Sequence, residues 1–157
     1  LGANVLVTGV SAEDYGGYPD CRPEFIEAFV VASSRGTFTG RDGAPGSLTV
    51  RTPLMERDKK ATVELAMVYE GCYEALALTH TAYDGQYPPL GRDHASLLRA
   101  KGFELAGIPD PLMLRAYLEG LVVGLPDTPN YRDAILIEFI PRVHTVMDWM
   151  RENGHAL

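Results

Sequence analysis

The amino-acid sequence predicts an α/β fold built around a parallel β-sheet. Short apolar runs with strand character alternate along the chain with longer segments of helical periodicity. The first run, NVLVTGV at residues 4–10, is almost continuously apolar, which is typical of a strand covered on both faces. Glycine and proline residues separate the segments where turns are expected. A chain of 157 residues fits a single domain of this class.

The elements of the first part follow from local signals. Residues 11–22 form a loop after the first strand, and Pro23 suits the first position of a helix that we expect to end at Gly36. Residues 47–51 alternate in polarity and predict a second strand, which Pro53 ends. The helix between the two strands carries an apolar stripe made of Phe25, Ile26, Phe29, Val30 and Ala32.

The middle of the chain predicts two helices around a third strand. Asp58 is suited to cap the start of a helix whose end is signalled by Gly71. The alternating segment YEALALT at residues 73–79 predicts the third strand. A glycine- and proline-rich loop follows, and then a helix bounded by Asp93 and Gly107.

The last part of the chain predicts helices only. One helix begins at Pro111, directly after an aspartate, and is expected to run to about Gly124. Residues 131–153 have helical periodicity, with a break or kink expected at Pro141. The apolar stripes of these segments indicate packing, so Tyr117 and Trp149 are expected in the core.

Composition excludes several functional classes. The net charge of −7 argues against a nucleic-acid-binding surface, which requires a basic face. Two cysteines are too few for a disulfide framework or a four-thiolate metal site, and they fit a reducing, cytoplasmic setting. No signal-peptide pattern is visible, and no apolar run is long enough for a membrane span.

The strand pattern begins almost at once after Leu1, and three strands make a thin sheet for this many helices. We therefore expect further parallel strands to come from an upstream segment or from a partner chain. An exposed parallel sheet edge would leave backbone groups without partners.

The loop after the first strand contains the sequence GGYPDCR at residues 16–22, which is rich in groups that bind ligands. Ligands of open α/β sheets bind beyond the carboxyl ends of the strands, where this loop lies. Carboxylates accept hydrogen bonds from a base edge, arginine pairs with a carboxylate or phosphate, and tyrosine rings stack on a heterocycle. The candidate binding residues are Asp14, Tyr15, Tyr18, Pro19, Asp20, Cys21 and Arg22. The alternative from the residues alone is an ordinary turn with a surface ion pair.

The segment TGVSAEDYGGYPDCRPEFIEAF at residues 8–29 resembles the signature of the 7-cyano-7-deazaguanine synthases, the QueC family. The resemblance continues in TPLMERDKKATVELA at residues 52–66 and in LLRAKGFELAGIPDP at residues 97–111. It covers about residues 1–113 and implies the carboxyl-terminal portion of an adenine-nucleotide α-hydrolase-like, PP-loop (Rossmann-like) domain. Residues 114–157 are then a helical C-terminal extension.

The resemblance also implies a reaction. Family members convert 7-carboxy-7-deazaguanine to 7-cyano-7-deazaguanine with ATP, magnesium and ammonia, and the product feeds queuosine synthesis for tRNA. The loop from Asp14 to Arg22 matches the deazaguanine-binding loop of the family. Lys59 matches a lysine near the ATP phosphates. Family members tend to be homodimers, so a homodimer is an implied assembly.

Two departures from the family pattern affect these expectations. The phosphate-binding SGGxDS loop of the family is absent, and GRDG at residues 40–43 is no substitute, so this chain alone is expected not to bind ATP productively. The four zinc-binding cysteines of the family are also replaced, by Ala82, Leu90, Asp93 and Ser96. A closed zinc site needs four good ligands, so zinc is expected to be absent. The alternative ligands to test are His80, Asp93 and His94.

Three functions remain open at this point. The chain is part of a QueC-like ligase completed by an upstream segment or a partner, or a non-enzymatic module that binds a deazaguanine or a protein. The third interpretation is a QueC-like enzyme that acts on another acid or acceptor.

Overall fold

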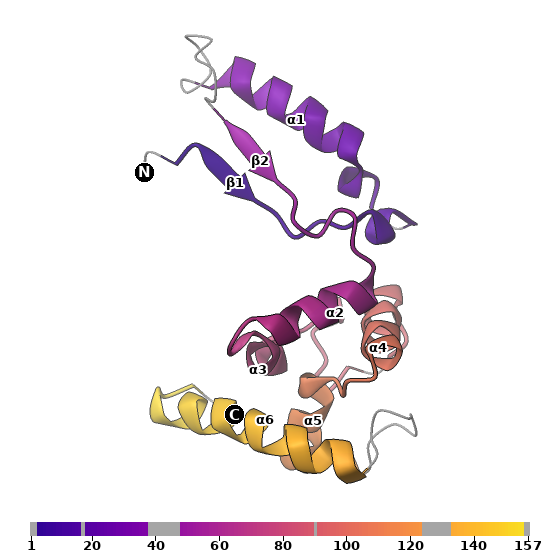
Figure 1. Ribbon diagram of the computed structural model, residues 1–157, viewed down its shortest axis with the longest axis vertical. Helices are drawn as coiled ribbons and strands as arrows, with labels where there is room; N and C mark the ends of the chain where they lie inside the picture. Colours follow the sequence, from indigo (N-terminus) through magenta and orange to yellow (C-terminus); the bar gives the residue numbers. More distant parts are fainter. Residues whose placement is uncertain (1–2, 17, 38–47, 90, 124–132, 156–157) are drawn as a thin grey trace. The chain divides into compact units, whose positions relative to one another are not determined.

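The computed structural model describes residues 3–16, 18–37, 48–89, 91–123 and 133–155 (Figure 1). The GRDG segment at residues 40–43 lies outside these ranges. The chain forms two compact units, residues 1–58 and residues 59–157, here called unit 1 and unit 2. The predicted division into residues 1–113 and 114–157 is based on the family resemblance, not on packing within the chain. It stays a prediction.

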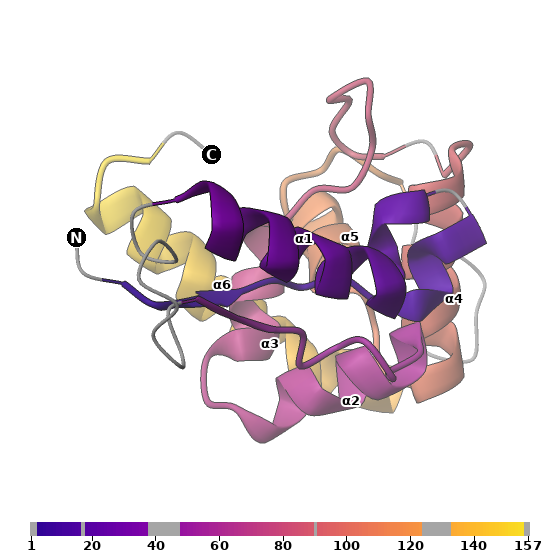
Figure 2. The same ribbon diagram turned by 90° about the horizontal axis from the view of Figure 1, so that it is seen from above.

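Unit 1 is a strand–helix–strand arrangement, as the sequence predicts. Its elements in order are β1 (Val5–Val7), η1 (Ala12–Gly16), η2 (Pro19–Cys21), α1 (Pro23–Gly36) and β2 (Thr49–Arg51). The two strands pair in parallel, with Leu6 opposite Val50. The helix α1 packs on β2 and lies along the strand pair (Figure 2). The fold class is therefore α/β with a small parallel sheet.

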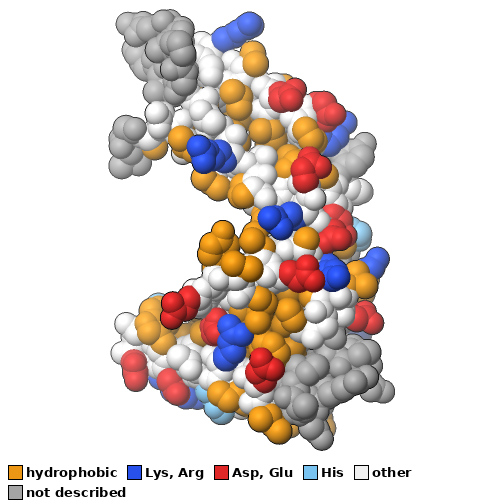
Figure 3. Space-filling model, in the orientation of Figure 1, with side chains coloured by type: hydrophobic (Ala, Val, Ile, Leu, Met, Phe, Trp, Pro, Cys, Tyr) orange, Lys and Arg blue, Asp and Glu red, His pale blue; other side chains and the backbone are white. Residues whose placement is uncertain are grey.

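The prediction that the first strand is covered on both faces is wrong for the described chain. Val5, Leu6 and Val7 are 41%, 44% and 69% exposed. The reason is that α1 buries none of its own residues, and two short strands with one helix cannot enclose the sheet. Figure 3 shows hydrophobic side chains on the surface of this unit. The described part of unit 1 therefore leaves apolar side chains of β1 exposed that the sequence pattern predicts to be buried.

Unit 2 is helical and contains the main hydrophobic core. Its elements are α2 (Lys59–Val68), α3 (Cys72–Ala75), η3 (Leu76–Leu78), α4 (His94–Ala106), α5 (Pro111–Leu118) and α6 (Asp133–Glu152). The core residues are Val63, Tyr73, Ala77, Phe103, Leu114, Phe139, Val143 and Met147. No helix among the described residues is long and apolar enough to cross a membrane.

The predicted third strand at residues 73–79 is wrong, because this segment forms α3 and η3. Gly71 adopts a left-handed conformation, with φ of 74°, and turns the chain into α3. Tyr73 and Ala77 are both fully buried, and their spacing of four places them on one face of a helix. A short alternating segment fits both periodicities, and here the buried positions follow the helical one.

The helix α4 has the boundaries that the sequence predicts. Asp93 caps it by accepting a hydrogen bond from the Ser96 backbone N–H at 2.9 Å, and Gly107 follows its last residue. Next along the chain, Asp110 caps α5 by accepting a hydrogen bond from the Leu112 N–H at 2.9 Å. The same carboxylate binds the Arg99 guanidinium through two hydrogen bonds of 2.7 and 2.8 Å, which tie α4 to the start of α5.

The predicted end of α5 and the predicted break at Pro141 are both wrong. The helix α5 ends at Leu118 rather than near Gly124, because Gly120 takes a left-handed conformation with φ of 73°. This turn is closed by the hydrogen bond from the Leu121 N–H to the Ala116 carbonyl oxygen at 2.9 Å. The helix α6 continues through Pro141 as one element.

The placement of two aromatic residues in the core was also wrong. Trp149 is 50% exposed and Tyr117 is 40% exposed. The buried stripe of α6 consists of Phe139, Val143, Met147 and Met150. Trp149 lies beside this stripe, so the helical periodicity that buries its neighbours leaves the indole at the surface.

Candidate functional site

The loop at residues 11–22 leaves the carboxyl end of β1 and is fastened to the segment that follows β2. The hydroxyl of Ser11 donates a hydrogen bond to the Arg57 carbonyl oxygen at 2.8 Å and accepts one from the Glu13 N–H at 3.2 Å. The Ala12 N–H donates to the Met55 carbonyl oxygen at 3.0 Å. Ser11 is 1% exposed, so this anchor is shielded from water. The structure thus joins two of the sequence motifs at one edge of the parallel pair.

Backbone hydrogen bonds give the loop its conformation. The N–H groups of Asp14, Tyr18 and Cys21 donate to the carbonyl oxygens of Ser11, Asp14 and Tyr18, each at 3.0 Å. These bonds build the two short 3₁₀ turns η1 and η2. In the second turn, Asp20 is exposed and Cys21 is buried.

The candidate residues differ in exposure. Asp14 is half-buried, Tyr18 is 37% exposed, and Asp20 and Arg22 are exposed. The Nε atom of Arg22 donates a hydrogen bond to the carbonyl oxygen of exposed Pro19 at 2.8 Å, which holds the guanidinium against the loop. The side chain of Tyr15 lies outside the described residues, as does Gly17. The loop therefore carries carboxylates, a guanidinium and a phenol ring within one short segment, and their role in binding a substrate stays a prediction.

Cys21 is the buried one among the candidate residues whose exposure is described, at 8%. It is the last residue of η2, and only Arg22 separates it from the start of α1. A buried thiol of this kind acts as a small apolar side chain. Its position favours a role in shaping the loop.

Lys59, the candidate ATP-phosphate residue, is the first residue of α2 and belongs to unit 2. A Cβ atom on Gly102, in α4, would lie 2.7 Å from the Cβ of Lys59. Because glycine has no Cβ, the two helices can approach this closely at Gly102. The helix α4 therefore packs closely against the start of α2. Its contact with ATP phosphates stays a prediction.

Two of the positions that replace the zinc cysteines bind each other. The carboxylate of Asp93 accepts hydrogen bonds from the Ser96 N–H at 2.9 Å and from the Ser96 hydroxyl at 2.6 Å. These hydrogen bonds lower the pKa of Asp93. The third replaced position, Ala82, lies in the loop before α4, and Leu90 lies outside the described residues. Within the described ranges, no three His, Cys, Asp or Glu side chains gather closely enough to hold a metal ion.

The alternative zinc ligands have other surroundings. His80 forms a hydrogen bond through Nε2 with the Gln86 carbonyl oxygen at 2.7 Å, and His94 is exposed at the start of α4. We predict that the purified protein contains far less than one zinc ion per chain by elemental analysis. A stoichiometric zinc content would contradict this prediction, and alanine variants of His80, Asp93 and His94 would then identify the ligands.

A cluster that the sequence did not predict holds the loop at residues 80–92. The hydroxyl of Tyr87 donates to Glu119 Oε2 at 2.6 Å, and Arg115 Nε donates to Glu119 Oε1 at 2.8 Å. The guanidinium of Arg115 also lies 4.9 Å from the centre of the Tyr87 ring. Tyr87 and Glu119 are 32 residues apart, so their contact leaves no local pattern in the sequence. Arg115 and Glu119 are four residues apart on one helix and their side chains are largely buried.

Burial, followed by the hydrogen bond to Glu119, raises the pKa of Tyr87 far above its ordinary value. The folded state therefore favours the protonated phenol. Its contribution to stability is complete below the unfolded-state pKa of about 10 and is lost as the pH rises toward the folded-state value. In an absorbance titration at 295 nm, the difference between the wild type and Tyr87→Phe should contain no ionisation step near pH 10. A step there would contradict the proposed environment.

Comparisons with known proteins address the region that contains the loop. The sequence matches the family model described as queuosine biosynthesis protein QueC over residues 1–107. A 7-cyano-7-deazaguanine synthase of Chromobacterium violaceum is 47% identical over 118 residues, which cover 75% of this chain and 47% of that protein. The enzyme of the same name from Leptospira biflexa is 42% identical over 113 residues, covering 71% and 44%.

A third relative with this name, from Solidesulfovibrio magneticus, is 43% identical over 122 residues, covering 75% of this chain and 49% of that protein. The chain thus spans about half the length of the curated relatives it matches. The family match includes the loop at residues 11–22, the segment after β2 and α4. It ends before α5 and α6.

Proposed function

The chain belongs to the family of queuosine biosynthesis protein QueC, and from this premise we propose that it forms part of an ATP-dependent ligase. The proposed reaction converts 7-carboxy-7-deazaguanine and ammonia to 7-cyano-7-deazaguanine, the queuosine precursor. The observation that carries the proposal is the anchored loop at residues 11–22, which lies within the matched range and at the carboxyl end of β1.

The loop offers groups that suit a carboxylated deazapurine. Asp14 and Asp20 supply carboxylate oxygens for the N–H donors of the aminopyrimidine edge. Arg22 supplies a guanidinium for the substrate carboxylate, and Tyr18 supplies an aromatic face for stacking. In this proposal the exposed residues of the loop become buried when the substrate binds.

The chemistry proposed for the completed enzyme has two activations. The substrate carboxylate attacks the α-phosphorus of ATP, with magnesium bound, and pyrophosphate leaves. Ammonia then displaces AMP to give the amide. The amide oxygen then attacks the α-phosphorus of a second ATP, with release of pyrophosphate and a proton, and loss of AMP and the second N–H proton leaves the nitrile. The role proposed for this chain is to hold and orient the heterocycle, with Lys59 placed near the phosphates.

The ATP-binding loop is proposed to come from residues outside positions 1–157, in the same polypeptide or in a partner chain. The apolar strand β1 supports this proposal, because Val5, Leu6 and Val7 have the pattern of a covered strand but are 41%, 44% and 69% exposed. Further strands and helices of a larger sheet would bury them. The proposal includes a cytoplasmic location, a small-molecule substrate and a homodimer, without nucleic-acid or membrane partners.

A second candidate is a protein that binds a deazaguanine without catalysis. The observation in its favour is the helix cap formed by Asp93 and Ser96, where the family pattern has thiolates. A related enzyme acting on another acid or acceptor fits the same observation. These two alternatives also assign heterocycle binding to the loop. They differ from the first proposal because neither would convert 7-carboxy-7-deazaguanine to the nitrile.

The test of the loop is a calorimetric titration of the protein with 7-carboxy-7-deazaguanine. Asp20→Asn keeps the shape of the side chain but removes its charge, and should weaken binding about tenfold or more, since hydrogen bonds to charged groups contribute about 1.5–3 kcal/mol. The matched control is Glu24→Gln, an equal charge change at an exposed position of α1. Equal affinities for the wild type and Asp20→Asn would overturn the assignment of the loop.

A further inference from the structure

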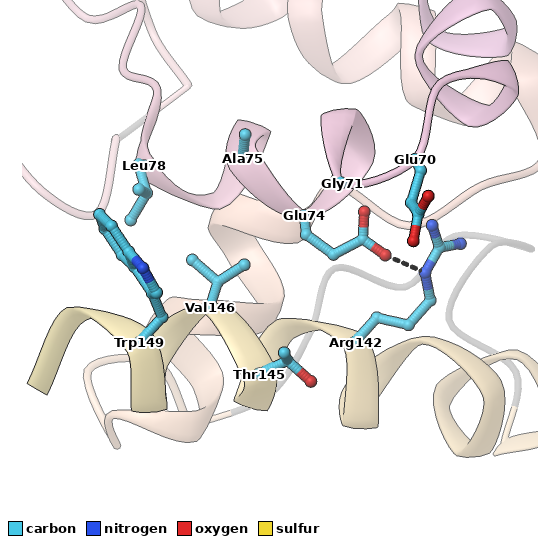
Figure 4. A pocket seen from close by; sticks show the side chains of 9 residues that line it. All are labelled: Glu70, Gly71, Glu74, Ala75, Leu78, Arg142, Thr145, Val146 and Trp149. Atoms are coloured by element: carbon cyan, nitrogen blue, oxygen red, sulfur yellow. Dashed lines mark hydrogen bonds and ion pairs between the residues drawn. The ribbon is translucent and has the colours of Figure 1, made fainter. Parts of the chain in front are cut away.

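A groove in unit 2 lies between the segment α3–η3 and the helix α6, and it has a volume of about 640 Å³. This size is within the range of small-molecule sites, about 300–1,000 Å³. Its lining residues are Glu70, Gly71, Glu74, Ala75, Leu78, Arg142, Thr145, Val146 and Trp149. Figure 4 shows the charged side chains gathered at one end of the groove and Leu78 with Trp149 at the other.

The charged end has more negative than positive groups. Arg142 Nε donates a hydrogen bond to Glu74 Oε1. The guanidinium is also held over the Tyr73 ring, 4.8 Å from its centre. Glu70 is a second carboxylate in the lining and is exposed. Two carboxylates and one guanidinium leave this end with a net charge of −1 when all three are ionised.

The second carboxylate oxygen of Glu74 strengthens this asymmetry. Oε2 is buried and has no hydrogen-bond partner among the described residues. A charge shielded from water acts over a greater distance than an exposed one, because the surrounding medium is less polar. Glu74 lines the groove with its charge offset by Arg142, and Glu70 adds an exposed carboxylate that a ligand can reach directly.

The opposite end is apolar and open. Leu78 is 41% exposed and Trp149 is 50% exposed, with Val146 between the two ends on α6. The imidazole of His155 stacks on the indole with ring centres 5.4 Å apart, which restricts the orientation of Trp149. Arg142 and Trp149 are seven residues apart on one helix, and this spacing corresponds to about 10 Å along the helix axis.

We propose that this groove binds a small organic cation with an aromatic body and an ammonium group at the end of a short chain. The aromatic ring lies against Trp149 and Leu78, and the ammonium group lies at the end formed by Glu70 and Glu74. The molecule spans most of the distance of about 10 Å between the two ends. The proposal goes beyond the proposed function, because the half of the groove on α6 lies outside the family-matched residues 1–107.

The test uses the fluorescence of Trp149, the only tryptophan in the 157-residue sequence. The probe is 4-phenylbutylammonium, titrated at low ionic strength and neutral pH. We expect a saturable change in emission and an affinity about tenfold higher than that of 4-phenylbutanol, which has the same shape without the charge. Equal affinities for the two compounds, or no saturable change with the ammonium probe, would overturn the proposal.

Three variants locate the binding. Glu70→Gln should weaken the ammonium probe by about threefold to fivefold, as expected for an exposed ion pair, and leave the alcohol unchanged. The matched control is Glu138→Gln, an exposed position on α6 outside the groove lining, which should change neither affinity. Ala75→Phe fills the groove from an exposed position and should abolish both, with the fold checked by circular dichroism. Equal weakening of the probe by the two glutamine variants, or binding that persists in folded Ala75→Phe, would refute the site.

Discussion

The 157-residue chain by itself should form no AMP from ATP in the presence of 7-carboxy-7-deazaguanine and ammonia. A cluster of backbone N–H donors near a helix start is a common binding site for the phosphate groups of a nucleotide. The SGGxDS sequence that supplies them in the family is absent from residues 1–157. We expect turnover only when the chain is joined to, or mixed with, a segment that carries this loop.

The measurement is the release of AMP, followed together with formation of the nitrile product. The control is Asp20→Asn in the completed form, which should lower turnover at a fixed low concentration of the heterocycle. AMP formation by the chain alone would show that the proposed source of the ATP site is wrong. An absence of turnover in both forms, with binding of the heterocycle retained, would favour the non-catalytic binding protein.

Leu114→Ala should destabilise unit 2 by about 2–5 kcal/mol, the range found for leucine side chains removed from packed cores. Leu114 is fully buried and belongs to the main hydrophobic core. The substitution removes apolar contacts and leaves a cavity that the surrounding helices fill only in part. Urea denaturation followed by the fluorescence of Trp149, which lies in the same unit, measures the change.

The control for this prediction is Leu97→Ala on α4, because Leu97 is 55% exposed. It should change the free energy of unfolding by less than about 0.5 kcal/mol, which is typical of surface substitutions. Similar losses for the two variants would mean that Leu114 is not part of a tightly packed core.

Local signals in the sequence were sufficient for several helices. The helix α4 begins and ends where Asp93 and Gly107 predict, because capping depends on residues that are close in sequence. The start of α5 after Asp110 has the same local cause. The position of residues 11–22 between β1 and α1 also agrees with the sequence, while their role as a binding site stays a prediction.

Features that depend on distant partners were not predictable in this way. Tyr73 is buried in a helical segment because it contacts Phe139 and donates to the Pro109 carbonyl oxygen, and neither partner is near it in sequence. The ion pair of Glu74 with Arg142, 68 residues apart, has the same character. In the candidate site, the sequence indicated candidate binding groups, whose role stays a prediction, but not the Ser11 anchor, because hydroxyl-to-backbone bonds have no distinctive pattern.

The described core of unit 2 is shared equally between two parts of the chain. Val63, Tyr73, Ala77 and Phe103 lie within the family-matched residues, while Leu114, Phe139, Val143 and Met147 lie beyond them. A chimaera that joins residues 1–107 to the corresponding end of another relative would therefore place a foreign surface against half of this core. Substitutions on the two sides must compensate each other in volume and shape. The end of the recognised family region is thus a junction inside one folding unit, where recombination between relatives should fail.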